Sequence, residues 1–197
     1  MWESDSSDGR SEIVEIAEQI AAEFIKEGRR LVAEHLIGGN FGNMSTRVCE
    51  EGFFITRTSS YLDEPGEPVY VPIFGEVPPV ASSEWRVHRS VYQGTRHRAI
   101  VHAHPPYAVA ASLVLDEVVP LDSEGKMFCP LIPIAHGEPG TQELADDIAE
   151  CLALAPVCIA RGHGTFAAGK TLEEGYLFTS LVEHACRVLS LTASFRS

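Results

Sequence analysis

The chain has 197 residues, of which 45% are hydrophobic and 22% are charged, and its formal net charge at pH 7 is −13. This length is enough for one sizeable domain, and no apolar run is long enough for a transmembrane helix, so no membrane span is expected. The acidic balance argues against general nucleic-acid binding, which requires a cationic surface.

The start of the chain and its cysteines indicate where the protein works. Residues 1–10 are polar and acidic, whereas a secretory signal begins with basic residues and continues with an apolar core. We therefore expect residues 1–10 to form a flexible tail and residues 11–197 to form a single domain. The five cysteines include no Cys-x-x-Cys pair, so no disulfide framework is predicted and a reducing cytoplasm is the expected location.

The first half of the chain is predicted to contain one long helix and several short strands. Apolar residues at three- and four-residue steps predict an amphipathic helix from Ser11, which could cap it, to about His35. The glycine-rich segment 38–43 ends this helix as a loop. Short strands are then expected over residues 44–48, 52–56 and 69–73.

The second half mixes helices and strands. Helices are predicted over residues 82–92, 107–115, 141–154 and 171–194, and strands over 99–101, 156–160 and 166–168. Thr171 and Glu174 fit a capping box at the start of the last helix. Because the elements do not follow a strict βαβ alternation, an α/β sandwich with a largely antiparallel sheet is favoured over a doubly wound fold.

A His-x-His pair is the strongest chemical signal. His102 and His104 end an apolar strand, in which residues two apart point to the same face, so both imidazoles can reach one metal. His163, between Gly162 and Gly164, is a third candidate, and three histidines leave a position open, as catalytic zinc sites do. The alternatives are partly buried, hydrogen-bonded histidines and a simple glycine turn.

Three polar segments stand out beside the histidines. They are residues 42–45, 56–60 and 82–84. Ser82 and Ser83 precede a predicted helix, whose first amides are free to donate to an anion. Plain N-capping is the alternative for the serines. Glu84 either compensates the helix dipole or places a carboxylate near the metal, as a ligand or a base.

The chain resembles the class II aldolase/adducin family from about residue 13 to 190. Five segments carry the resemblance because they occur in the family's order: Gly42-Asn43-Met44-Ser45, Ile55-Thr56-Arg57-Thr58-Ser59, Ser82-Ser83-Glu84-Trp85-Arg86-Val87-His88, His102-Ala103-His104 and Gly162-His163-Gly164. The resemblance implies a three-layer α/β/α sandwich around a mainly antiparallel central sheet. It also implies a homotetramer with active sites at the subunit interfaces.

The resemblance assigns roles to individual residues. His102, His104 and His163 would hold Zn²⁺ or another divalent metal. Glu84 would bind the metal in the resting enzyme and then act as the acid/base residue. The substrate phosphate would be bound by Gly42, Asn43, Thr58, Ser59, Ser82 and Ser83.

The implied reaction is a reversible aldol cleavage. A ketose 1-phosphate such as L-fuculose 1-phosphate would give dihydroxyacetone phosphate and an aldehyde such as lactaldehyde, through a metal-stabilised enediolate. The enzymes of this type use a tyrosine before the third histidine as proton donor to the aldehyde, but segment 120–128 contains none. Glu124, or Tyr107 from a neighbouring subunit, are the candidates for this role.

Other interpretations remain open within and outside enzyme chemistry. A ribulose-5-phosphate-like 4-epimerase has Asp where Glu84 stands, which favours the aldolase. A metal-dependent dehydratase or decarboxylase could use the same scaffold. An adducin-like interaction module needs no catalytic residues, and the intact set of ligands argues against it. A structural zinc site usually has four protein ligands and favours cysteine.

Overall fold

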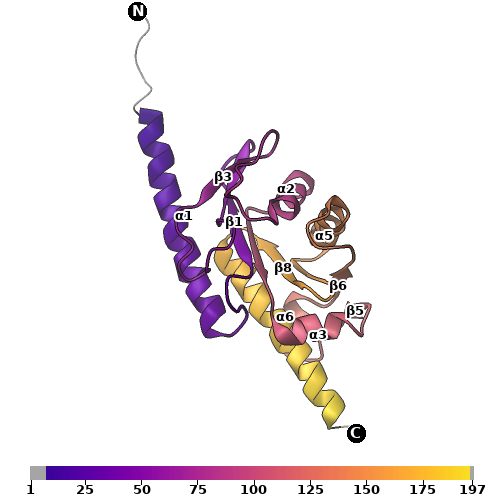
Figure 1. Ribbon diagram of the computed structural model, residues 1–197. Helices are drawn as coiled ribbons and strands as arrows, with labels where there is room; N and C mark the ends of the chain where they lie inside the picture. Colours follow the sequence, from indigo (N-terminus) through magenta and orange to yellow (C-terminus); the bar gives the residue numbers. More distant parts are fainter. Residues whose placement is uncertain (1–7, 196–197) are drawn as a thin grey trace, which may run out of the picture.

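One mixed sheet lies at the centre of the structure, a computed structural model that describes residues 8–195 (Figure 1). The described chain forms eight strands: β1 (Asn43–Arg47), β2 (Gly52–Ile55), β3 (Val69–Pro72), β4 (Ala99–Ala103), β5 (Glu117–Val118), β6 (Ile132–Ala135), β7 (Val157–Ala160) and β8 (Gly164–Gly169). It forms six helices: α1 (Asp8–Ala33), α2 (Trp85–Gly94), α3 (Pro106–Ser112), α4 (Ser123–Phe128), α5 (Gln142–Leu154) and α6 (Leu172–Ser194).

The strand order across the sheet is β3-β2-β1-β4-β8-β7-β6-β5. All neighbouring strands are antiparallel except β6 and β7, which run parallel because helix α5 crosses over between them. The prediction of a mainly antiparallel sheet is therefore corrected to a mixed sheet. The α/β class is confirmed.

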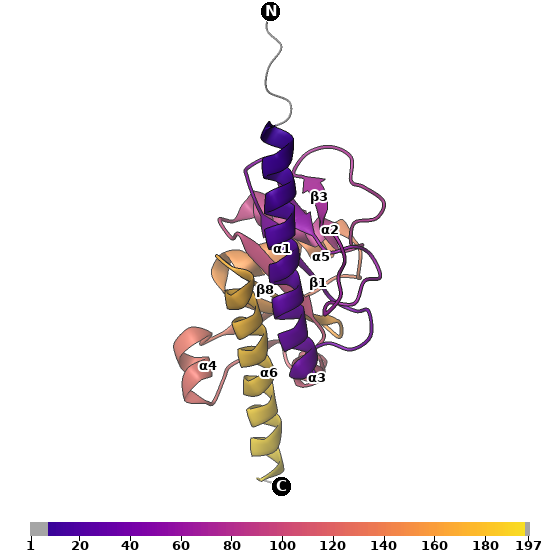
Figure 2. The same cartoon turned by 90° about the vertical axis from the view of Figure 1, so that its left-hand side faces the viewer.

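Helices cover both faces of the sheet. Helices α2 and α5 pack on one face, where Phe53, Ile100 and Phe166 form part of the core. Helices α1 and α6 lie side by side on the other face, over Met44 and Val101 (Figure 2). The short helix α3 joins α6 on that second face. Alternate residues of β4 thus enter opposite cores, as the two-residue period of a strand requires.

The helix ends differ from the sequence prediction at two places. Helix α1 begins at Asp8, so residues 8–10 belong to the helix rather than to a tail, Ser11 lies inside it, and residues 1–7 of the predicted tail lie outside the described residues. Helix α2 begins at Trp85, after both serines, with Glu84 as its N-cap residue. The start of α6 is as predicted, because the Thr171 side chain accepts a hydrogen bond from the Glu174 amide.

The segment from 116 to 135 contains three elements that the sequence did not predict. Strands β5 and β6 are two and four residues long, too short for their periodicity to stand out. Helix α4 is held at its start by Asp122, whose carboxylate accepts the Gly125 N–H at 2.7 Å. In the part of the chain that the structure describes, no helix is long and apolar enough to cross a membrane.

Candidate metal centre

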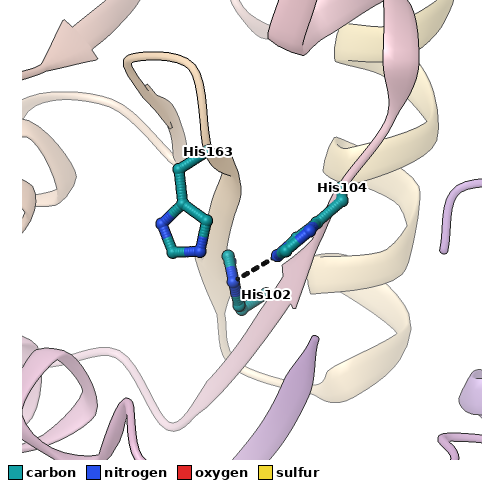
Figure 3. A group of neighbouring side chains, drawn as sticks. All are labelled: His102, His104 and His163. Carbon is teal, nitrogen blue, oxygen red and sulfur yellow. Dashed lines mark hydrogen bonds between the residues drawn. The ribbon is translucent and has the colours of Figure 1, made fainter. Parts of the chain in front are cut away.

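Three histidines from two parts of the sheet converge on one point (Figure 3). His102 lies in β4, His104 follows the end of that strand, and His163 lies in the turn between β7 and β8. One ring nitrogen from each lies within 4.8 Å of those of the other two. The prediction that His102 and His104 share a face is confirmed, because their Nε2 atoms face each other at 2.9 Å.

The orientation of the His102 ring is fixed by a backbone carbonyl. Its Nδ1 lies 2.9 Å from the carbonyl oxygen of Thr165 in the neighbouring strand β8. Only a protonated Nδ1 can bond to a carbonyl, so the Nε2 atom carries the free lone pair. This is the tautomer that a histidine needs when its other nitrogen binds a metal.

All three rings are held neutral. Burial lowers the pKa of His104 to about 4, with a smaller contribution from the neighbouring His163. Burial also lowers the pKa of His163, and it lowers that of the fully buried His102 well below the ordinary value. Metal binding requires neutral imidazoles, and the lowered pKa values keep these rings neutral at neutral pH without help from a metal.

Two glycines make room for the histidines. A Cβ atom on Gly164 would lie 2.3 Å from the Ala103 carbonyl oxygen and 2.8 Å from Cδ2 of His104. Gly42 has a φ of +79°, and a Cβ there would lie 2.6 Å from the His102 carbonyl oxygen. The backbones thus approach closely at Gly164, while Gly162, with φ +67°, forms the turn.

Two aromatic rings that the sequence analysis did not single out support the histidines. Phe166 stacks on His102 with ring centroids 4.0 Å apart, and Phe41 stacks on His104 at 5.7 Å. Phe166 is buried in the core, whereas Phe41 is 59% exposed beside the triad. Phe166 is the cross-strand partner of His102, so only the pairing of β4 with β8 could have indicated its role.

The donor set fits a divalent metal. Nε2 of His163 faces the other two rings, whereas its Nδ1 points away from them (Figure 3). Oε2 of Glu84 is buried and has no hydrogen-bond partner among the described residues; buried polar atoms are normally paired, so this oxygen is free for a ligand. Three neutral imidazoles are a donor set that zinc and similar metals take.

Glu84 lies at the start of α2 and is separate from the triad. Its backbone carbonyl accepts hydrogen bonds from the amides of Val87 and His88, which places its side chain at the first turn. Burial raises the pKa of its carboxyl group, and the charge of Arg86 opposes that rise. The cluster of side chains that could hold a metal ion contains the histidines alone among the described residues.

The predicted phosphate-binding residues fall into separate groups. Asn43 is paired across the sheet with His102, and Gly42 touches the His102 backbone. Thr58 and Ser83 line a cavity of about 430 Å³ beside the loop before α2. Ser82 is buried, with its hydroxyl accepting the Glu84 amide at 3.4 Å.

The same region contains Ser59 and the positively charged side chain of Arg86. Ser59 is exposed and has a φ of +60°, which residues other than glycine rarely adopt. Arg86 lines the cavity of Thr58 and Ser83, and its guanidinium lies 4.5 Å from the ring of Trp85. The sequence analysis gave Arg86 no role, although it stands two residues after Glu84 in a segment already singled out.

The two candidate proton donors lie apart from the triad. Tyr107 is in the first turn of α3, where Arg187 of α6 lies 5.8 Å from its ring centre. Glu124 is exposed on α4. Among the described residues of this one chain, no hydrogen bond or ring contact joins either side chain to the three histidines.

The comparisons with known proteins agree with this geometry. The family model for the class II aldolase and adducin N-terminal domain matches residues 22–190. An L-fuculose phosphate aldolase of Methanococcus vannielii is 32% identical over 179 residues, which cover 88% of this chain and 97% of the relative. The crystal structure of L-fuculose-1-phosphate aldolase from Thermus thermophilus has a TM-score of 0.84 and 36% identity, and the match covers 89% of this chain and 95% of that one. A sugar-phosphate aldolase from Thermotoga maritima shares the fold, with a TM-score of 0.74 and 22% identity over 90% of this chain and 96% of that one.

Proposed function

The chain belongs to the class II aldolase and adducin family, and on this premise we propose that it is a zinc-dependent aldolase acting on a ketose 1-phosphate such as L-fuculose 1-phosphate. The products would be dihydroxyacetone phosphate and an aldehyde such as lactaldehyde. The observation that carries the proposal is the convergence of three neutral histidines in a chain of this family. Zinc, or another divalent metal, would be held by His102, His104 and His163.

The metal and the side chain of Glu84 would supply different parts of the chemistry. When bound, the metal supplies a Lewis acid beside the substrate ketone, where negative charge develops as the carbon–carbon bond breaks. Glu84 would exchange a proton with the carbon that becomes carbanionic: it removes that proton from dihydroxyacetone phosphate in synthesis and returns it in cleavage. Its raised pKa suits this exchange, since an acid/base group works best when its pKa lies near the working pH.

The phosphate would bind through neutral donors and one cation. The donors are Gly42, Asn43, Thr58, Ser59, Ser82 and Ser83. The guanidinium of Arg86 gives this region a local positive charge in a chain whose net charge is −13. Phosphate contacts away from the reacting bond would hold the ketone in place, which lowers the entropy cost of the reaction.

We propose a homotetramer that works in the cytoplasm. Large apolar side chains are exposed around α3 and α4, among them Leu113, Val114, Met127 and Phe128, and such a surface is typical of a subunit interface. A neighbouring subunit could then bring Tyr107 or Glu124 to the aldehyde as proton donor. The five cysteines are all free thiols, as a reducing compartment maintains.

A product assay tests the proposed function. The purified protein would be given fuculose 1-phosphate, rhamnulose 1-phosphate and ribulose 5-phosphate, with zinc content measured on the same preparation. Release of dihydroxyacetone phosphate and about one zinc per chain support the proposal. An epimerised pentose would identify a 4-epimerase, and activity that survives complete chelation would rule out the metal mechanism.

A further inference from the structure

A buried chain of hydrogen bonds links α2 to the strand beside the triad. His88 of α2 lies 2.6 Å by its Nδ1 from the Ser45 hydroxyl and 2.6 Å by its Nε2 from Oδ1 of Asn43. The Ser45 hydroxyl lies 2.7 Å from the hydroxyl of Tyr92. All four side chains are buried, with exposed fractions of 3% or less.

This chain of hydrogen bonds lies on the same face of the sheet as the triad. Asn43 is directly opposite His102, and Ser45 is directly opposite Ile100, in the antiparallel pair of β1 and β4. Directly opposite residues share a face of the sheet, and Ile100 belongs to the core under α2 and α5. Asn43 therefore links the imidazole of His88 to the position beside the metal ligand His102.

The hydroxyl of Tyr92 sets the direction of the whole chain of bonds. A phenol has one proton to donate, and among the described residues Ser45 is the only hydrogen-bond partner of this hydroxyl. Tyr92 thus donates to Ser45, and Ser45 donates to Nδ1 of His88. The protonated Nε2 of His88 then donates to the carbonyl oxygen of Asn43. The reverse direction would leave the buried phenol proton without an acceptor, which is unfavourable.

The protonation state of His88 agrees with this direction of hydrogen-bond donation. Burial lowers its pKa to about 3, so the ring is neutral and carries a single N–H. A doubly protonated ring would donate to Ser45, whose own hydroxyl proton would then lose its acceptor, Nδ1 of His88. The remaining group at the end of the chain of bonds is the amide NH₂ of Asn43, which donates to no protein atom among the described residues.

We propose that His88 is a positioning residue that holds the carbonyl of Asn43 and thereby presents the Asn43 amide NH₂ to the substrate phosphate. This inference rests on the proposed function, since that function makes Asn43 a phosphate ligand. It adds a residue outside the metal and phosphate sets. It also assigns Tyr92 and Ser45 to the same task, because they determine which nitrogen of His88 carries the proton.

Phosphate binding by single variants tests the role of His88. Inorganic phosphate would be titrated into the zinc-loaded protein by calorimetry, and the KM for the phosphorylated substrate would be measured separately from kcat. His88→Leu removes the donor to Asn43, so we expect phosphate affinity to fall about tenfold and KM to rise by a similar factor, with a smaller change in kcat. His88→Gln offers a donor and an acceptor in place of the two ring nitrogens and should restore most of the affinity.

A matched control separates positioning from stability. His97 is a half-buried histidine with a single ring bond, to the carbonyl of Leu152 at the end of α5. His97→Leu should therefore leave phosphate affinity unchanged while it lowers stability. If His88→Leu binds phosphate as tightly as the wild type, the positioning role is wrong and the proposed function stands. If the wild type itself binds no phosphate and cleaves no ketose phosphate, both proposals fail.

The imidazole nitrogens give a readout that does not depend on activity. Nitrogen NMR of the folded protein should show His88 protonated at Nε2 and unprotonated at Nδ1. Tyr92→Phe removes one hydroxyl and keeps the ring that packs against Phe53, so it should allow the opposite tautomer and weaken phosphate binding. A wild-type His88 protonated at Nδ1 would overturn the inference directly.

Discussion

Replacing Gly164 by alanine tests how tightly the metal centre depends on strand packing. The added Cβ would lie 2.3 Å from the Ala103 carbonyl oxygen, and real Cβ atoms essentially never come closer than 3.0 Å to such a neighbour. Strands β4 and β8 must then separate locally by about 0.7 Å. Overpacking of this kind costs about 1–3 kcal/mol of unfolding free energy.

The same displacement acts on two of the proposed metal ligands. The new methyl group would also lie 2.8 Å from His104 and 3.1 Å from His102. Metal–ligand distances must be right to within about 0.2 Å, so a shift of this size should lower zinc affinity by roughly 10- to 100-fold, as lost supporting contacts do. The rings themselves, and their protonation, are unchanged.

Two measurements check this prediction. Zinc affinity would be determined by competition with a coloured chelator, and unfolding free energy by urea titration of the metal-free protein. Gly94→Ala is the matched control, because nothing lies within 4 Å of its added Cβ; it should leave zinc affinity unchanged and should not lower the unfolding free energy. Wild-type zinc affinity together with wild-type stability in Gly164→Ala would refute the close-packing argument.

Three further predictions each concern one side chain. Glu84→Gln should abolish aldol cleavage with zinc still bound, because the histidines remain and the base is lost; full activity in a product assay would contradict this role. Arg86→Ala should raise the KM for a ketose phosphate about tenfold, whereas Arg96→Ala, which removes an exposed arginine just beyond the far end of α2, should not. The pKa of His88 is lowered to about 3, so the unfolded chain takes up more protons than the folded one as pH falls below 6.5. Unfolding free energy should therefore fall by up to about 1.4 kcal/mol per pH unit for this group as pH drops from 6.5 towards 3, and the slope measured by urea titration at several pH values should be smaller in His88→Gln.

Local sequence patterns predicted the structural features that depend only on residues close together in the chain. The two-residue period of a strand placed His102 and His104 on one face, and the capping pattern placed the start of α6 at Thr171. The parallel pairing of β6 with β7 could not be predicted in the same way. It depends on where β6 lies after α5 has crossed the sheet, and β6 itself is only four residues long.

The hydrogen-bond partners of His88 could likewise not be predicted from the local sequence. His88 belongs to segment 82–88, which the sequence analysis singled out. Its two nitrogens bind Asn43 and Ser45, which stand 45 and 43 residues earlier in the chain. Nothing in the local sequence distinguishes this buried histidine from one that merely fills the core. Only the register of β1 against β4 places Asn43 opposite His102 and within reach of His88.

An unpartnered atom of the site connects its stability to its function. Oε2 of Glu84 is buried without a hydrogen bond among the described residues, and such an atom costs roughly 1–3 kcal/mol. A ligand that engages this oxygen meets it only in the folded chain, so its binding must stabilise the fold. The arrangement that weakens the ligand-free protein is therefore the one that leaves this oxygen free for substrate protons.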